Sequence, residues 1–235
     1  MSAPPSPRVA RRRRLAVVVG ALLVVGTAAW MVSRSPLLDV DHVVVQGNAR
    51  VAPEEILASS GVAPGDAMVW LDRGGAARAI EALPWIRTAQ VHREWPGTVD
   101  ITVRERVAVG WVDAGDGRAL VVDGAGRALE VDAAAPPGLP ELLEVAPAPV
   151  GASISPSGGA WLAGHLTTDE LAAIRSISVV DQHATLVVTS GQEVRFGRLT
   201  QVGQKMLAAI AVLLQPGIGT ATYIDVSAPS TPVAG

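Results

Sequence analysis

The chain has 235 residues, a length that fits one large domain or two small ones. Hydrophobic residues make up 49% of it and charged residues 17%, with a mean hydropathy of +0.34, which excludes an intrinsically disordered chain and a protein with many membrane spans. The absence of cysteine excludes disulfides, thiolate nucleophiles, iron–sulfur clusters and cysteine-containing zinc sites.

Charge is distributed unevenly along the chain. Five arginines and no acidic residue precede residue 15, whereas all 22 Asp and Glu residues lie from Asp39 onward. Residues 33–235 therefore carry 14 basic against 22 acidic side chains, a net charge of −8 that the overall value of −3 conceals. This balance disfavours nucleic acid as a partner of that part.

Residues 15–32 (LAVVVGALLVVGTAAWMV) form an uncharged apolar run of 18 residues. As a helix it covers about 27 Å, just enough to span a bilayer. Four arginines precede it and Arg34 alone follows, so the positive-inside rule predicts a single-pass type II protein, with residues 1–14 in the cytoplasm. A cleaved signal peptide is the alternative, because small residues lie at 27–29. Both interpretations export the rest of the chain.

The residue pattern of the first exported segment, residues 37–106, predicts the element order β-α-α-β-β. In its last strand Val99, Ile101 and Val103 alternate strictly with polar residues, which indicates one buried and one solvated face. We expect a three-stranded sheet with two helices on one face. The expected elements are strands at 40–45, 86–93 and 98–104, a short helix from Pro53 to the stop at Gly61, and a helix over 72–83.

A series of motifs in this segment resembles the FtsQ-type POTRA domain of the bacterial cell-division FtsQ (DivIB) family. The motifs occur in a fixed order and are specific only in combination. They are Val45-Gln46-Gly47-Asn48, Pro53-Glu54-Glu55-Ile56, Leu83-Pro84-Trp85-Ile86, Val91-His92-Arg93-Glu94-Trp95-Pro96 and Val103-Arg104-Glu105-Arg106.

Residues 107–226 predict a mixed, mostly antiparallel β-domain with flanking helices. A helical region is expected over 160–176 in two pieces, and a clear helix over 200–215 directs Val202, Met206, Ile210 and Leu213 to the core and leaves Lys205 on the polar side. Residues 133–140 and 146–159 are expected to be connectors, and 227–235 a polar C-terminal tail. Strands are expected at 107–113, 119–122, 128–131, 177–180, 184–189, 193–196 and 222–226.

Motifs in this second module are similar to the β-domain of the FtsQ family, particularly of the high-GC Gram-positive type. The motifs are Leu120-Val121-Val122-Asp123-Gly124, Val194-Arg195-Phe196-Gly197 and Tyr223-Ile224-Asp225-Val226-Ser227. The expected fold class is therefore α+β, with a single N-terminal transmembrane helix, a βααββ POTRA domain and a mixed antiparallel β-domain.

No pattern in the sequence predicts catalysis. The four histidines are scattered without an HExxH or other ligand spacing, and no serine lies in a GxSxG turn. The acidic pairs Glu54-Glu55 and Asp169-Glu170 fit helix starts, where the dipole favours them. We expect no enzyme activity, no metal or other cofactor, and no small-molecule substrate.

The resemblance implies a cell-division scaffold at the septum that binds bitopic division proteins of the FtsB (DivIC) and FtsL kind. It implies a partner-binding edge at the C-terminal strand and the neighbouring helix, here Lys205, Tyr223, Ile224, Asp225, Val226 and Ser227. It also implies that the second POTRA strand is a free edge, here with Arg87, Thr88, Gln90 and His92. A sheet edge binds a partner by adding another strand.

Two other classes of function remain open at this point. One is a POTRA-containing protein transport or assembly factor, and the other is an exported cell-wall enzyme. Septal localisation distinguishes the division scaffold from the first, and activity of residues 33–235 on cell-wall fragments identifies the second.

Overall fold

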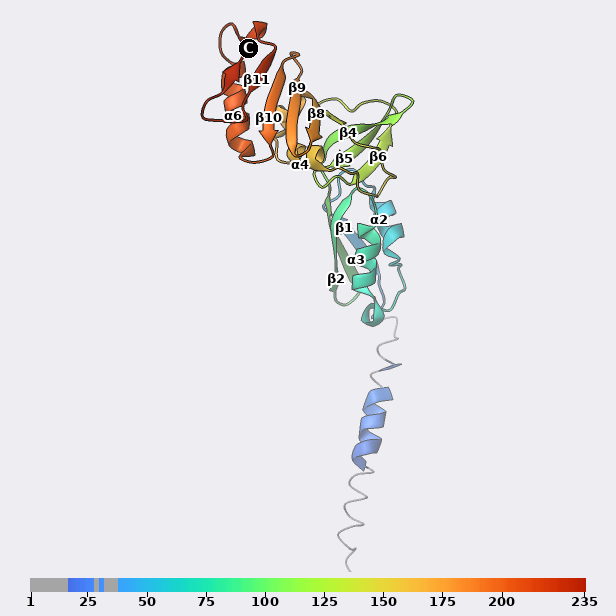
Figure 1. Cartoon of the computed structure of the whole chain (residues 1–235). Coiled ribbons are helices and arrows are strands. Elements are labelled where there is room, and N and C mark those ends of the chain that lie inside the picture. Colours follow the sequence, from blue (N-terminus) through green and yellow to red (C-terminus); the bar gives the residue numbers. More distant parts are fainter. Residues whose placement is uncertain (1–16, 28–29, 32–37) are drawn as a thin grey trace, which may run out of the picture. The chain divides into compact units, whose positions relative to one another are not determined.

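The structure is a computed structural model that describes residues 17–27, 30–31 and 38–235 (Figure 1). Residues 17–27 and 30–31 are helical. Among the described residues, no helix is both long enough and apolar enough to cross a membrane. Residues 15, 16, 28, 29 and 32 of the predicted span lie outside the described part, as does the predicted cytoplasmic segment 1–14.

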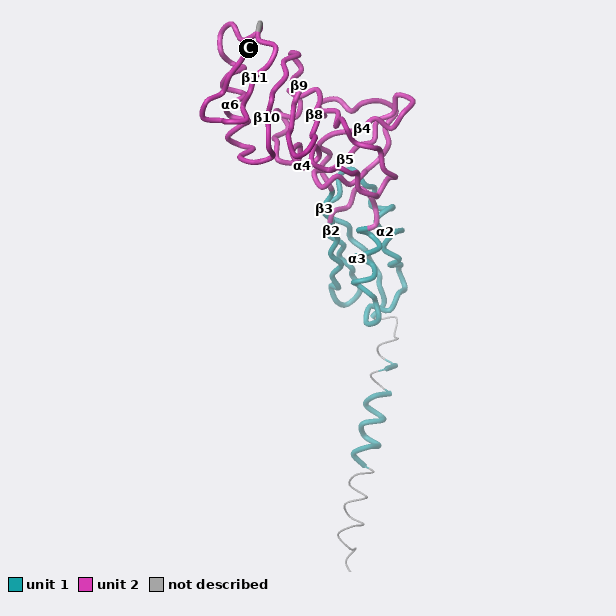
Figure 2. The backbone as a smooth tube through the Cα atoms, in the orientation of Figure 1, with its two compact units in different colours: residues 1–81, 88–105 teal, residues 82–87, 106–235 magenta. Residues whose placement is uncertain are grey.

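The folded part divides into two compact units (Figure 2). Unit 1 comprises the described residues up to 81 together with residues 88–105, and unit 2 comprises residues 82–87 and 106–235. Each unit has its own sheet: three strands in unit 1, one of which begins in unit 2, and nine strands in unit 2.

Unit 1 has the predicted β-α-α-β-β order, with a short 3₁₀ helix between the two α-helices. Its sheet has the strand order β1-β3-β2, and β1 runs parallel to β3. Strand β2 is therefore an edge strand. The elements are β1 (His42–Gln46), α2 (Pro53–Ser60), η2 (Met68–Trp70), α3 (Arg73–Glu81), β2 (Ile86–Glu94) and β3 (Thr98–Glu105).

Local sequence explains these elements. Pro53 occupies the first turn of α2, and Gly61 ends the helix in the left-handed conformation with φ of 67°. The carboxylate of Asp72 accepts a hydrogen bond from the Gly75 N–H at 2.9 Å at the start of α3. In β3, the alternating residues Val99, Ile101 and Val103 are at most 1% exposed, as their spacing predicts.

Unit 2 is built on a mixed sheet with the strand order β12-β11-β10-β9-β8-β7-β4-β5-β6. Most neighbouring pairs are antiparallel, but β4–β7, β7–β8 and β10–β11 are parallel. The strands are β4 (Ala108–Gly115), β5 (Arg118–Asp123), β6 (Ala128–Asp132), β7 (Glu141–Leu143), β8 (Ile174–Val180), β9 (His183–Val188), β10 (Glu193–Arg198), β11 (Tyr223–Asp225) and β12 (Val233–Ala234).

Helices cover this sheet and close one continuous core. Helix α4 contacts β4, β7 and β8, α5 contacts β8, and α6 contacts β11. Phe196, the largest fully buried side chain, lies in this core. The helices are α4 (Gly158–Ala163), α5 (Thr168–Ala172) and α6 (Val202–Leu213), followed by the 3₁₀ helix η3 (Ile218–Thr220).

Four details of unit 2 differ from the sequence-based expectations. Strand β7 was not predicted, and β8 begins at Ile174, so that residues 174–176 are strand and not the end of a helix. Lys205 is buried, not on the polar face of its helix. The predicted polar tail, 227–235, contains β12, which pairs with β11. Strands β7 and β12 and the first residues of β8 form because neighbouring strands pair with them. Lys205 is buried because the Arg198 carbonyl accepts a hydrogen bond from its ammonium group.

Candidate interaction site

The C-terminal edge of the unit 2 sheet is formed by β12, not by β11. Strand β11 is parallel to β10 on one side and antiparallel to β12 on the other, with Ile224 opposite Ala234 and Asp225 opposite Val233. The expectation that residues 223–227 themselves form the open edge is therefore wrong. Two prolines, Pro229 and Pro232, lie in the connection before β12, where their missing N–H groups do not interrupt the ladder.

The residues predicted to bind a partner at this edge differ in accessibility. Ile224 and Val226 are 0% exposed, Tyr223 and Asp225 are half-buried, and Ser227 is exposed. The Asp225 carboxylate accepts hydrogen bonds from the Ser227 hydroxyl at 2.6 Å and from its N–H at 2.9 Å. These bonds lower the pKa of Asp225, against the opposing effect of burial.

Lys205 reaches the same region from α6 but is only 2% exposed. Its Nζ donates a hydrogen bond to the Arg198 carbonyl at 2.7 Å and lies 5.2 Å from the centre of the Phe196 ring. Burial lowers the pKa of Lys205, while the charge of Asp225 opposes that shift. The ammonium group thus links α6 to the end of β10 by a hydrogen bond. That Lys205 binds a partner remains a prediction.

Three of the predicted POTRA edge residues, Thr88, Gln90 and His92, lie on one face of β2, whereas Arg87 lies on the other. Thr88, Gln90 and His92 are exposed and alternate with the buried Ala89 and Val91. The Arg87 side chain, at the start of the strand, is also exposed. Their role in partner binding is likewise still a prediction.

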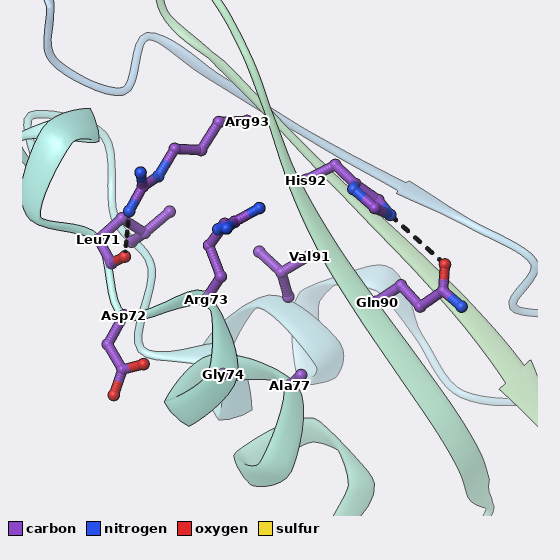
Figure 3. A pocket seen from close by; sticks show the side chains of 9 residues that line it. All are labelled: Leu71, Asp72, Arg73, Gly74, Ala77, Gln90, Val91, His92 and Arg93. Atoms are coloured by element: carbon purple, nitrogen blue, oxygen red, sulfur yellow. Dashed lines mark hydrogen bonds between the residues drawn. The ribbon is translucent and has the colours of Figure 1, made fainter.

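A hollow of about 510 Å³ lies on the other side of β2, between this strand and the start of α3 (Figure 3). Arg73 from α3 and Arg93 from β2 both line it. The Arg93 guanidinium donates a hydrogen bond to the Leu71 carbonyl, and Figure 3 shows the Asp72 carboxylate pointing away from both arginines. The sequence reasoning missed this pair, because the two arginines come together only through the packing of α3 on β2.

A second hollow, of about 190 Å³, lies in unit 2 between α5, α6 and the sheet. Its lining is apolar apart from Asp169 and Glu170. The Glu170 carboxylate is already engaged, because it accepts a hydrogen bond from the Thr167 N–H at 2.7 Å in a capping box at the start of α5. No nucleophile–base pair lines this hollow, and the described residues contain no cluster of three metal-ligating side chains.

The geometry is thus that of sheet edges and surface hollows, and comparison with known proteins identifies the family. The family described as POTRA domain, FtsQ-type, matches residues 38–106. The cell division protein FtsQ of Mycobacteroides abscessus is 32% identical over 222 residues, which cover 93% of this chain and 68% of that protein. The chain belongs to the FtsQ family.

Other FtsQ proteins match over both units. FtsQ of Corynebacterium glutamicum is 28% identical, with 88% of this chain and 93% of that protein covered. FtsQ of Mycolicibacterium smegmatis is 32% identical over 84% of this chain, which spans 57% of that protein. These matches confirm the resemblance that the LPW and WP motifs predicted.

Proposed function

We propose that this FtsQ-family chain is a scaffold of the bacterial divisome, which links cytoplasmic and extracytoplasmic components at the septum by binding other division membrane proteins. The observation that carries the proposal is the similarity to cell division proteins named FtsQ, which extends over both compact units. The open edges of both sheets support a function in binding, because an edge strand offers unpaired N–H and C=O groups to a partner.

The proposed arrangement places the two folded units outside the cytoplasm. Residues 15–32 anchor the chain and 1–14 remain inside, an orientation supported by the arginines that precede the apolar run. We assign residues 37–106 to a POTRA domain and 107–226 to the β-domain. The described helical residues 17–27 are uncharged, and Leu22 and Val24 are 66% and 70% exposed, as suits contact with lipid.

The proposed partners are bitopic division proteins of the FtsB (DivIC) and FtsL kind. Each contact at a sheet edge is expected to be modest. Confinement of both proteins to one membrane raises their effective concentration and so strengthens binding. In this account the chain acts by binding and positioning, without catalysing a reaction.

At the C-terminal edge, the backbone of residue 234 is the group offered to a partner. The N–H of Gly235 donates to the Tyr223 carbonyl at 3.1 Å, and the N–H of Tyr223 donates to the Gly235 carbonyl at 3.0 Å. Because hydrogen-bonded and non-hydrogen-bonded pairs alternate in an antiparallel ladder, the backbone groups of Ala234 point away from β11. The substitution Ala234→Pro removes the outward N–H and leaves the bonds of Gly235 to β11 in place.

Co-purification from dividing cells tests both the scaffold and this edge. We expect the full-length wild-type chain and the control Ala234→Val, which keeps the N–H, to recover the FtsB- and FtsL-like proteins. Ala234→Pro should recover much less. Equal recovery with Ala234→Pro contradicts the C-terminal edge, whereas failure of the wild-type chain to recover any division protein contradicts the scaffold.

A further inference from the structure

We propose that the β2 edge of unit 1 binds an extended, acidic segment of a partner protein and that Arg73 and Arg93 together hold one of its carboxylates. This inference rests on the proposed scaffold function and specifies the chemistry of one partner. It is based on three features of unit 1: two arginines that form no ion pair with a described carboxylate, an open strand edge and a hollow beside it.

The two arginines carry charge that no described carboxylate neutralises. Neither guanidinium forms an ion pair within the described part of the chain, and the Nε of Arg93 is buried without a hydrogen-bond partner there. The neighbouring Asp72 is engaged with the Gly75 N–H. A guanidinium binds a carboxylate more strongly than it binds a neutral acceptor, because both groups are charged.

The strand edge beside the hollow offers backbone donors. The N–H of Ala89 donates to the Glu81 carboxylate at 3.0 Å, so this N–H faces away from β3. N–H groups alternate between the two sides of a strand, and those of Val91 and Arg93 therefore face the same open side. A partner strand that pairs here lies directly along the hollow, which these two residues line.

Side chains of the added strand on the helix side would enter the hollow. Residues opposite each other in neighbouring strands share a face, and β2 directs Val91 and Arg93 to the helix side. Gly74 and Ala77 of α3 also line the hollow and leave space because they are small. We place the carboxylate of an aspartate or glutamate at this position beside both arginines, which line the hollow.

The charges also define the register of the partner. Glu81 lies at the Ala89 end of the edge, and the arginines lie at the Arg93 end. A carboxylate placed next to Glu81 is repelled, whereas one placed next to Arg93 is attracted. The partner segment should therefore carry its acid only at the end that lies beside Arg73 and Arg93.

Peptide binding to the full-length chain in detergent micelles tests the proposal. The probes are three fluorescent peptides of β-branched residues: one with a single Glu near one end, one with Gln in its place, and one with Glu and N-methylated backbone amides that cannot pair. We expect the Glu peptide to bind about tenfold more tightly than the Gln peptide, because one charge-assisted hydrogen bond increases affinity by about that factor. The N-methylated peptide should not bind.

Two charge reversals in unit 1 provide the comparison. Arg73→Glu should abolish the preference for Glu, whereas Arg104→Glu, an exposed change on β3 outside the hollow, should retain it. The N-terminal arginines are common to all variants, so attraction to them does not differ. Circular dichroism verifies the fold of each variant.

Several results would overturn the proposal. The first three are equal binding of the Glu and Gln peptides, no binding of either, and equal effects of the two charge reversals. The fourth is undiminished binding of the N-methylated peptide, which would indicate an anion site that binds without strand addition. Septal localisation of the wild-type chain is scored separately. A septal chain without the Glu preference refutes the acidic partner alone, whereas a chain absent from the septum refutes the scaffold.

Discussion

Arg106 Nη1 lies 2.7 Å from Asp123 Oδ2 in unit 2, and the two side chains are only 16% and 8% exposed. The other carboxylate oxygen of Asp123 accepts hydrogen bonds from the N–H groups of Ala125 and Arg127 at 2.9 and 2.8 Å. The Nε of Arg106 donates to the Ile86 carbonyl at 3.2 Å. The buried pair is thus well supplied with partners, which is the condition under which such pairs are retained.

Removing one member of this pair should be costly. Asp123→Ala leaves the Arg106 charge buried and is expected to lower the free energy of unfolding by about 3–5 kcal/mol in urea titrations. The control is Asp116→Asn, in an exposed pair whose nearest atoms are 3.9 Å apart, with an expected loss of about 0.5 kcal/mol or less. Similar losses for both variants would show that burial does not determine the value of the pair.

Because of Glu105, the stability of unit 1 should change with pH in the acidic range. Burial alone would raise its pKa, but hydrogen bonds from the N–H groups of Val51, Ala49 and Arg50, with the charge of Arg50, lower the pKa below its usual value. The folded-state pKa is therefore below the unfolded one, and the stabilisation is present above about pH 4.3 and is lost as the pH falls through the folded-state value.

Unfolding of Glu105→Gln at several pH values tests this linkage. The variant should be less stable than the wild type at pH 7, and the difference should shrink as the medium becomes more acidic than about pH 4.3. A difference that stays constant across this range would contradict the assigned role of the carboxylate.

Gly47 should not tolerate a side chain. Its φ is +83°, and an added Cβ would lie 2.2 Å from the Val103 carbonyl oxygen in β3. Gly61 has a comparable φ of +67° but open space around it, so Gly61→Ala measures the backbone strain alone, about 1 kcal/mol. Gly47→Ala is expected to lose roughly 1–3 kcal/mol more in urea unfolding, because β1 and β3 must separate. Equal losses would show that this close approach is unimportant.

Lys205 should be replaceable by an apolar side chain of similar length. Because burial lowers its pKa, the folded chain releases a proton more easily than the unfolded chain, and the charge opposes folding until the pH approaches the unfolded value of about 10.4. Lys205→Met should stay within about 1.5 kcal/mol of the wild type in the free energy of unfolding. Lys205→Ala should lose about 2 kcal/mol or more because it leaves a cavity. Equal losses for the two variants would indicate that the bond to the Arg198 carbonyl dominates.

Local sequence patterns predict most of unit 1. Pro53 and Gly61 mark the ends of α2, and the alternation in β3 identifies its buried face without reference to other elements. The short strands of unit 2 have no such signal. Strands β7 and β12 have three and two residues, too few to show an alternating pattern of apolar and polar residues. They form because neighbouring strands pair with them.

Tertiary contacts also override local patterns in the candidate sites. Ile174 continues an apolar helical period but lies opposite Val188 in the β8–β9 ladder. Lys205 is polar, yet the Arg198 carbonyl provides an acceptor inside the fold. Arg73 and Arg93 have no spacing that predicts their proximity, which arises from the packing of α3 beside β2.

The position of the protein in dividing cells tests the scaffold function most directly. A fluorescent fusion of the full-length chain, expressed as the sole copy in its own bacterium, should concentrate at the septum during constriction. It should do so with the fluorophore on the cytoplasmic N-terminus. A uniform membrane signal throughout division would contradict the account.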